Sequence, residues 1–217
     1  MNITKNLMIK QLSRMPKTGD FDELNFRRGV NVLVGESSTG KTQWLKMLNF
    51  LMGDRDSNVS NAFESDLVEK YDSVKGVFIL GDQEITLERN WKQSGNKGKI
   101  YIDGRAIRAE DFSMEFLSSL NIPTLYYPQG NPLSSRKWPE LSWRSLLRHV
   151  YRKQSSWGDL ADKQVPVEQH ACILLFLGIA EYLFSPEYKQ LVDKQKEIYT
   201  KEVRKEEFVN TLNVTSQ

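Results

Sequence analysis

The chain has 217 residues, of which 39% are hydrophobic and 27% are charged, and its formal net charge is +2. This composition excludes wholesale disorder, and the small net charge excludes a strong global field for nucleic acid, so DNA contact would need a local basic patch. The single cysteine, Cys172, excludes an intramolecular disulfide. No apolar run is long enough to span a bilayer, and no secretory signal opens the chain. We expect a cytoplasmic globular protein with no membrane partner.

The first part of the chain predicts three short strands. The first two are Asn2 to Ser13 and Leu24 to Arg28, with a turn at Lys17 to Asp20 between them. Val32 to Val34 then forms a β-branched and aliphatic run, as is typical of a buried parallel strand. This third strand leads directly into a motif.

The segment Gly35 to Thr42 fits the phosphate-loop pattern GxxxxGK followed by Ser or Thr, and apolar residues recur at helical spacing from Trp44 to Met52. Two glycines without Cβ atoms let the backbone bend around phosphate and turn its N–H groups inward. Lys41 supplies a charge for the β- and γ-phosphates, Thr42 offers a hydroxyl to Mg²⁺, and the helix N-terminus favours an anion. The sequence therefore predicts a site for a nucleoside triphosphate with Mg²⁺, and the alternative is a chance match in a polar turn. The candidate contacts are Gly35, Glu36, Ser37, Ser38, Thr39, Gly40, Lys41, Thr42 and Gln43.

An antiparallel β-meander is predicted after a polar loop at Gly53 to Ser65. Its turns are Gly81-Asp82 and Ser94 to Gly98, and Asp103-Gly104 makes a further hairpin turn. The expected strands are Val74 to Leu80, Glu84 to Trp91 and Lys99 to Ile102.

The remainder of the chain is predicted to be helical. The first helix, Phe112 to Leu120, has Asp111 or Ser113 as its expected N-cap. Leu141 to Gln154 and Val167 to Leu183 follow as stronger helices.

The last segment, Pro186 to Leu212, is rich in Lys, Glu and Gln. Pro186 fits the first turn of a helix. The seam of a coiled coil is visible, although Glu202 and Lys205 interrupt it. We expect either the start of a coiled-coil stalk over 185–217, after a lobe over 1–184, or a terminal helix packed on its own domain, with a frayed end from Thr211. The seam residues are Tyr188, Leu191, Gln195, Ile198, Val209 and Leu212.

A P-loop ATPase also needs an acidic Mg²⁺ ligand at the end of an apolar strand. Val77 to Glu84 contains Asp82 after apolar residues, but it falls within the meander and reads as a hairpin turn. Ile173 to Glu181 contains no Asp and has the pattern of a buried helix. The hydrolytic carboxylate is therefore missing from this chain or comes from elsewhere.

Phe26 to Gly35, leading into Gly40-Lys41-Thr42, resembles the opening of the SMC/RecF-type ABC ATPases, including recombination-repair members with long coiled coils. The resemblance implies an α/β P-loop lobe of the ABC/SMC-head type, with a mixed sheet, a β-meander and a coiled-coil-like end. It covers the N-terminal half of such a head, and the signature motif and acidic strand of the C-terminal half have no counterpart here.

The resemblance also implies partners. A C-terminal lobe, in the same or a separate chain, would complete the head, and a second head would sandwich ATP, so that the isolated chain binds ATP with little turnover. The biological setting would be DNA repair, chromosome organisation or anti-phage defence.

Two further residues take roles from the resemblance. Gln154 is similar to the glutamine that touches Mg²⁺ and the attacking water, so that it and Lys41 are the expected catalytic residues; Gln129 is its rival. Arg14 resembles an N-terminal basic residue that contacts nucleotide phosphate, and the alternative is a solvated arginine.

Arg144, Arg148 and Arg152 are spaced i, i+4, i+8 and would share one helix face. Such a stripe could bind DNA phosphates without sequence preference, remain solvated, or pair with acids on a partner lobe. His170 and Cys172 have no companion ligands, so we expect no metal site there.

Other classes of P-loop protein remain open. A GTPase would need an Asn-Lys-x-Asp element, and Asn96 to Lys99 ends in Lys. A nucleoside kinase would need an arginine-rich lid, for which the Arg144 to Arg152 helix is available. A non-hydrolysing, ATP-dependent interaction module is the alternative outside the enzymes.

Overall fold

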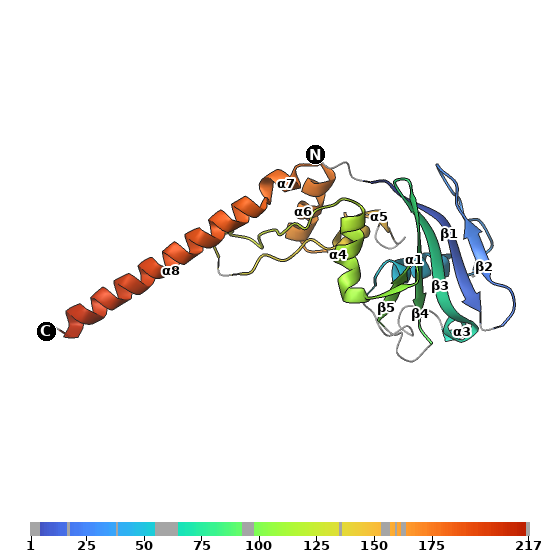
Figure 1. The fold of residues 1–217 in the computed structure, drawn as a ribbon, viewed down its shortest axis with the longest axis horizontal. Helices are drawn as coiled ribbons and strands as arrows, with labels where there is room; N and C mark the ends of the chain where they lie inside the picture. The colour runs from blue at the N-terminus through green and yellow to red at the C-terminus, as the bar shows by residue number, and fades with distance from the viewer. Residues whose placement is uncertain are drawn as a thin grey trace. The chain divides into compact units, whose positions relative to one another are not determined.

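The computed structural model describes residues 5–16, 18–37, 39–54, 65–92, 98–134, 136–152, 157–158, 160–161 and 164–215. The chain is a mixed α/β protein that divides into two compact units (Figure 1). Unit 1 is Met1–Ile122 with Ser142–Arg144, and unit 2 is Pro123–Leu141 with Ser145–Gln217.

Unit 1 is built on a six-stranded sheet in the order β2-β1-β3-β4-β5-β6 (Figure 1). The meander predicted from the sequence is confirmed in β3, β4 and β5, and a hairpin adds β6. Asp103 (φ 48°) and Gly104 (φ 81°) both have positive φ in the last turn, as a tight hairpin requires. The strands are β1 (Leu7–Pro16), β2 (Asp22–Asn25), β3 (Tyr71–Leu80), β4 (Gln83–Asn90), β5 (Lys99–Ile102) and β6 (Arg105–Arg108).

Three predictions about the strands are wrong. The mixed sheet is not observed, because every pairing among the described strands is antiparallel. The second strand begins at Asp22 and ends at Asn25, since its register is set by pairing with β1. Val32 to Val34 forms no strand, because the described residues place no neighbouring strand beside it to complete a hydrogen-bonded ladder.

Helix α1 (Lys41–Leu51) packs on β3 and β4. Its buried face includes Trp44, Met47 and Phe50. Gly76 on β3 allows the close approach, because a Cβ there would lie 2.8 Å from the Cδ2 atom of Leu51. Burial of each large apolar side chain contributes about 1.5–3 kcal/mol, so this contact fixes α1 on the sheet.

Arg89 of β4 ties the sheet to the C-terminal end of α1. Its Nη1 atom donates to the backbone oxygens of Phe50 and Asp54, both at 2.6 Å, and the guanidinium lies 3.8 Å from the Phe50 ring centroid. Burial lowers the pKa of Arg89 to about 10, and the Asp54 carboxylate opposes that shift. The Phe50 oxygen, in the last turn of α1, also accepts from the Gly53 N–H at 3.2 Å, and a cationic donor is favourable at this end of a helix.

Two further helices are described in unit 1: α3 (Ser65–Lys70), before β3, and α4 (Ala109–Ser119), which packs on β5 and β6. The predicted caps of α4 are wrong, because Arg108 is the N-cap residue. Asp111 lies inside the helix and pairs with Arg108 at 2.9 Å, and the Ser113 hydroxyl accepts from the Trp143 N–H at 2.8 Å.

Unit 2 contains most of the described helices. Helix α5 (Trp143–Val150) ends before Gln154, where its end was predicted. Its first two residues belong to unit 1. The predicted helix from Val167 to Leu183 is interrupted, since Gly178 adopts φ 73° and divides it into α6 (Pro166–Phe176) and α7 (Ala180–Leu183).

Helix α8 (Pro186–Thr215) runs for 30 residues, so the last segment is helical, as both alternatives for it required. It continues past Thr211, whose hydroxyl donates to the Glu207 oxygen at 2.8 Å. The prediction that the chain frays from Thr211 is therefore wrong for residues 211–215, which are helical. Val192 is buried and the Tyr188 ring lies 5.8 Å from that of Trp138, so the start of α8 packs within unit 2. No single helix in the described part of the chain is long and apolar enough to cross a membrane; the segments Pro166–Phe176 and Ala180–Thr211 pass that test only together, as a pair bent by 119°.

Candidate functional site: the phosphate loop and its surroundings

The predicted phosphate loop lies in unit 1, immediately before α1. Gly40 is the N-cap residue of that helix, with φ 82°, and its oxygen accepts from the N–H groups of Gln43 at 3.0 Å and Trp44 at 3.4 Å. This left-handed conformation favours glycine. The chain therefore turns sharply into the helix at the position where the motif places its second glycine.

The Lys41 side chain folds back over the loop. Its Nζ atom donates to the Gly35 oxygen at 2.8 Å, to the Glu36 oxygen, and to the Thr39 hydroxyl at 3.3 Å. The Thr39 hydroxyl itself donates to the Glu36 oxygen at 2.9 Å. The loop carbonyls thus hold the Lys41 ammonium group over the loop. In the motif, this loop is the segment that binds phosphate.

The loop leaves little room for a side chain at its first glycine. A Cβ on Gly35 would lie 3.1 Å from the Thr39 hydroxyl and 3.7 Å from Lys41 Nζ. A compact loop, a cation above it and a helix N-terminus beside it fit a polyphosphate, and Thr42, which is exposed, fits a Mg²⁺ ligand by the chemistry of its hydroxyl. Gln43 is buried in the first turn of α1, so its side chain packs within unit 1. Ser38 lies outside the described residues.

Arg14 is held beside the first turns of α1. Its guanidinium lies 4.3 Å from the Trp44 ring centroid and 4.6 Å from that of Tyr71, and its Nε atom is 3.1 Å from Asp22. Only 14% of the Arg14 side chain is exposed. The arginine is therefore clamped between two aromatic rings rather than solvated. One of these rings, that of Trp44, lies three residues after Lys41 on the helix.

Asp22 completes this clamp. Its carboxylate accepts from the Tyr71 hydroxyl as well as from Arg14. The Tyr71 hydrogen bond is the main cause that holds the Asp22 pKa below its ordinary value, and the nearby cations of Arg14 and Lys70 add to it, while burial opposes it. Sequence reasoning missed Asp22, Tyr71 and Trp44 as a group. The available signal was the hairpin, because its register pairs Arg14 with Asp22.

Two known proteins are similar to part of this chain. The DNA repair protein RecN of Aquifex aeolicus (strain VF5) is 33% identical over 84 residues, which is 38% of this chain and 14% of that protein. The DNA replication and repair protein RecF of Bacillus mycoides (strain KBAB4) is 32% identical over 81 residues, 36% of this chain and 21% of that protein. No protein-family model matches the chain.

The matched segments span about a fifth or less of those two relatives. The similarity supports the SMC/RecF-type resemblance at a coarse level.

The residues before the loop expose apolar side chains. Val32 and Val34 are 75% and 80% exposed, and Val30 is more exposed still. Beside them is a cavity of about 370 Å³ lined by residues of β1, β2, the 25–33 segment and α1. Leu45 and Leu48, on a second apolar side of α1, line this cavity. A continuous apolar surface of this kind is typical of an interface.

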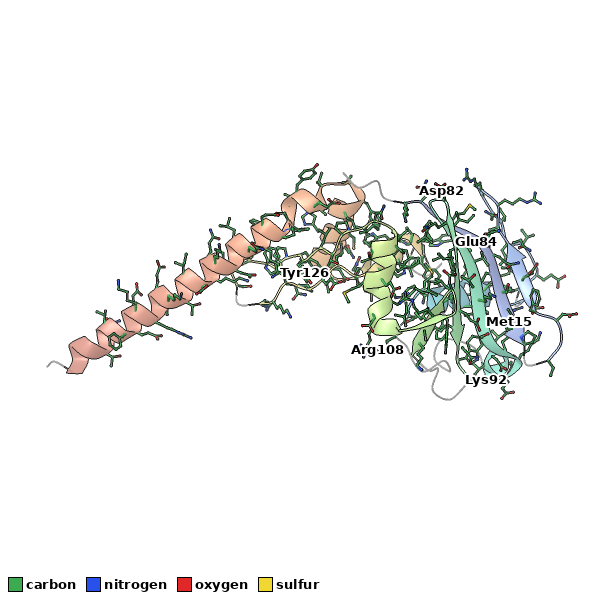
Figure 2. The ribbon with its side chains drawn as sticks, viewed as in Figure 1. Met15, Asp82, Glu84, Lys92, Arg108 and Tyr126 are labelled. Atoms are coloured by element: carbon green, nitrogen blue, oxygen red, sulfur yellow. The ribbon has the colours of Figure 1, made fainter. Side chains whose placement is uncertain are left out.

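Neither acidic stretch considered from the sequence forms a strand that ends in a carboxylate. Asp82 is exposed in the turn between β3 and β4 (Figure 2), which confirms the hairpin interpretation. Glu181 is exposed in the short helix α7. Among the described residues no group of His, Cys, Asp and Glu could hold a metal ion, and burial raises the pKa of the Cys172 thiol to about 11.

Only one of the two glutamine candidates can be placed. Gln129 is exposed in a bend of unit 2, and Gln154 lies outside the described residues. Their roles stay predictions.

The predicted arginine stripe is shorter than its spacing indicated. Because α5 ends at Val150, only Arg144 and Arg148 lie on the helix. Arg144 Nη1 donates to the Asn49 side chain at 2.8 Å, and its Nη2 atom is 3.7 Å from Asp54, so it braces the end of α1. Arg152 donates to the Leu160 oxygen beyond the helix. Binding of DNA by these residues stays a prediction.

Proposed function

We propose that this chain is the ATP-binding N-terminal lobe of an SMC-like ATPase that acts on DNA. The observation that carries the proposal is the fold of Lys41 over the Gly35 and Glu36 carbonyls at the start of α1. The resemblance to RecN and RecF, which are named as DNA repair proteins, supports the link to DNA.

In this proposal the residues of the loop bind and orient the triphosphate. Lys41 leaves the loop carbonyls and binds the β- and γ-phosphate oxygens, and the loop N–H groups and the N-terminus of α1 bind the remaining negative charge. Mg²⁺, held in part by Thr42, neutralises phosphate charge when bound. We assign to Arg14 a contact with nucleotide phosphate, and to Gln154 the orientation of Mg²⁺ and water.

Completion by a second lobe is the other part of the proposal. The exposed Val32 to Val34 segment and the cavity beside Leu45 and Leu48 would receive strands of a C-terminal half, from the same or a separate chain. That half would bring the acidic strand, because Asp82 and Glu181 occupy a turn and a helix. Hydrolysis would then require both halves, and ATP would join two such heads.

We also assign residues 185–217 to a stalk that follows a lobe over 1–184. Along α8 the side chains of Leu191, Ile198, Phe208 and Val209 are exposed, and they fit a returning helix of the partner half.

Isothermal titration calorimetry with Mg-ATP tests the nucleotide site. We expect wild-type chain to bind, Lys41→Ala to lose binding by tenfold or more, and Lys46→Ala, a matched change on the same helix, to bind like wild type. Steady-state hydrolysis by the chain alone should stay near background and rise when a segment with the acidic strand and signature motif is added. Robust turnover without that segment would contradict the half-head assignment, and absence of binding would contradict the nucleotide site.

A further inference from the structure

The clamp around Arg14 leaves part of its guanidinium without a partner. The Nε atom donates to Asp22 at 3.1 Å, and the rings of Trp44 and Tyr71 have their centroids 4.3 Å and 4.6 Å from the guanidinium carbon. Among the described residues, the Nη1 and Nη2 atoms make no hydrogen bond. Neither of them is a buried atom that lacks a partner, and 14% of the side chain is exposed, so both keep access to solvent.

A guanidinium held in this way can bind an oxyanion. Its N–H donors form a planar fork that matches two oxygens of a phosphate or a carboxylate. Because Nε is taken by Asp22, the two Nη groups are available for a second anion. The aromatic rings already restrict the side chain, so little further conformational entropy is lost when an anion binds.

The clamp lies close to the phosphate loop. Trp44 follows Lys41 by three residues, which is about 4.5 Å along the helix axis. Residues at this spacing are neighbours on the surface of a helix. Because Arg14 stacks on Trp44, its charge lies on the side of α1 that also bears Lys41. Two cations therefore belong to one end and one side of this helix.

We propose that Asp22 and Tyr71 are positioning residues for the nucleotide, because they hold Arg14 so that its Nη groups bind a phosphate oxygen of the triphosphate on the loop. This inference rests on the proposed function. Asp22 fixes the Nε atom, and Tyr71 packs on the guanidinium and donates its hydroxyl to the Asp22 carboxylate. Tyr71 is only 1% exposed, so it acts through Arg14 and not by touching the nucleotide.

A clamp that only joins the β1–β2 hairpin to α1 would affect nucleotide binding in the opposite direction. Asp22 would then act on the triphosphate through space alone. Removal of its negative charge would strengthen binding, because repulsion between like charges would be lost. If Asp22 positions Arg14, the same change weakens binding. The direction of the change in Mg-ATP affinity therefore separates the two roles.

Isothermal titration calorimetry with Mg-ATP on the full chain measures this direction. We expect Asp22→Asn to weaken binding about three- to tenfold, and Tyr71→Phe, which keeps the ring and removes the donor, to weaken it about two- to threefold. Glu23→Gln is the matched control. It removes the same charge one residue along β2, on the opposite face of that strand, and should bind like wild type or slightly tighter.

Unchanged or tighter binding by Asp22→Asn, with a wild-type circular dichroism spectrum, would overturn the proposal. Unchanged binding by Tyr71→Phe would remove Tyr71 from it. Absence of Mg-ATP binding by the wild-type chain would instead contradict the nucleotide site, so the two failures are distinguishable.

A double-mutant cycle tests whether the effect passes through Arg14. Arg14→Ala alone should weaken Mg-ATP binding about tenfold or more. Addition of Asp22→Asn to that variant should cause no further loss, because the group that Asp22 positions is already gone. A further loss of about threefold or more in the double variant would show that Asp22 acts independently of Arg14 and would overturn the proposal.

Discussion

The two apolar sides of α1 have different surroundings. On one side Met47, Phe50 and Leu51 are buried against the sheet. On the other side Leu45 is about half exposed and lines a cavity beside the exposed Val32 to Val34 segment. Helices of a finished lobe rarely leave an apolar side and an adjoining apolar segment uncovered. The apolar residues of α1 are therefore buried where the helix faces the sheet and partly exposed where it faces the segment before the phosphate loop.

The largest expected effect is on the sheet side. Phe50→Ala should lower the free energy of unfolding by about 3–5 kcal/mol, because it leaves a cavity between α1, Arg89 and Trp91. Leu45→Ala is the matched change on the open side and should cost less than about 1 kcal/mol. Urea denaturation followed by circular dichroism measures both. Equal losses from the two variants would remove the distinction between the two sides.

A second prediction concerns the Arg89 contact at the end of α1. Arg89→Met keeps much of the side-chain volume but leaves the Phe50 and Asp54 carbonyls without their donor. We expect a loss of about 2 kcal/mol in the same denaturation experiment. Arg105→Met, at an exposed position on β6, is the control and should change stability little. A stable Arg89→Met variant would mean that water replaces the arginine at the helix end.

The clamp around Arg14 predicts a small pH dependence. Because the Asp22 pKa is lower in the folded chain, its contribution to stability is present above the ordinary value of 3.8 and is lost as the pH falls through the folded value. Asp22 is partly exposed, so we expect less than about 1 kcal/mol. Denaturation midpoints measured from pH 5 down to about pH 2 should fall less steeply in Asp22→Asn than in wild type. Parallel profiles would show that the carboxylate contributes nothing.

The smallest effect on the chain alone is expected at Val32. Val32→Lys should change the free energy of unfolding by less than about 0.5 kcal/mol, because the side chain is 75% exposed. In the proposed two-part head the same change should prevent the added segment from restoring ATP hydrolysis, because it puts a charge into the interface. Hydrogen exchange should also show protection of the 32–34 amides only when that segment is present. Full restoration by Val32→Lys would place the second lobe elsewhere.

Local signals predicted local structure well. The phosphate-loop pattern predicted a backbone bend at its glycines and a helix after them, and Gly40 in a left-handed conformation is followed by α1. The Asp103-Gly104 dipeptide predicted a hairpin turn, because few other residue pairs tolerate positive φ. These features depend on the conformational preferences of residues that are close in sequence, so they can be predicted from the sequence.

Features that depend on distant residues were predicted poorly. The Val32 to Val34 run has strand composition, but a strand forms only where another strand completes its hydrogen bonds. Arg144 was read as part of a basic stripe, whereas its partner, Asn49, lies 95 positions earlier in the chain. The α6–α7 break at Gly178 was missed because one glycine within an apolar pattern does not by itself end a helix.

The sequence by itself determined the motif that points to a nucleoside triphosphate, the turns of the meander and the long terminal helix, since each depends on spacing and on residue conformations along a short stretch. Only the tertiary structure decided that Arg14 is clamped between Trp44 and Tyr71, that the apolar segment before the loop is left uncovered, and that Tyr127 lines a cavity. The physical reason is that burial and pairing belong to residues brought together by folding, and their separation along the chain gives no measure of their distance in space.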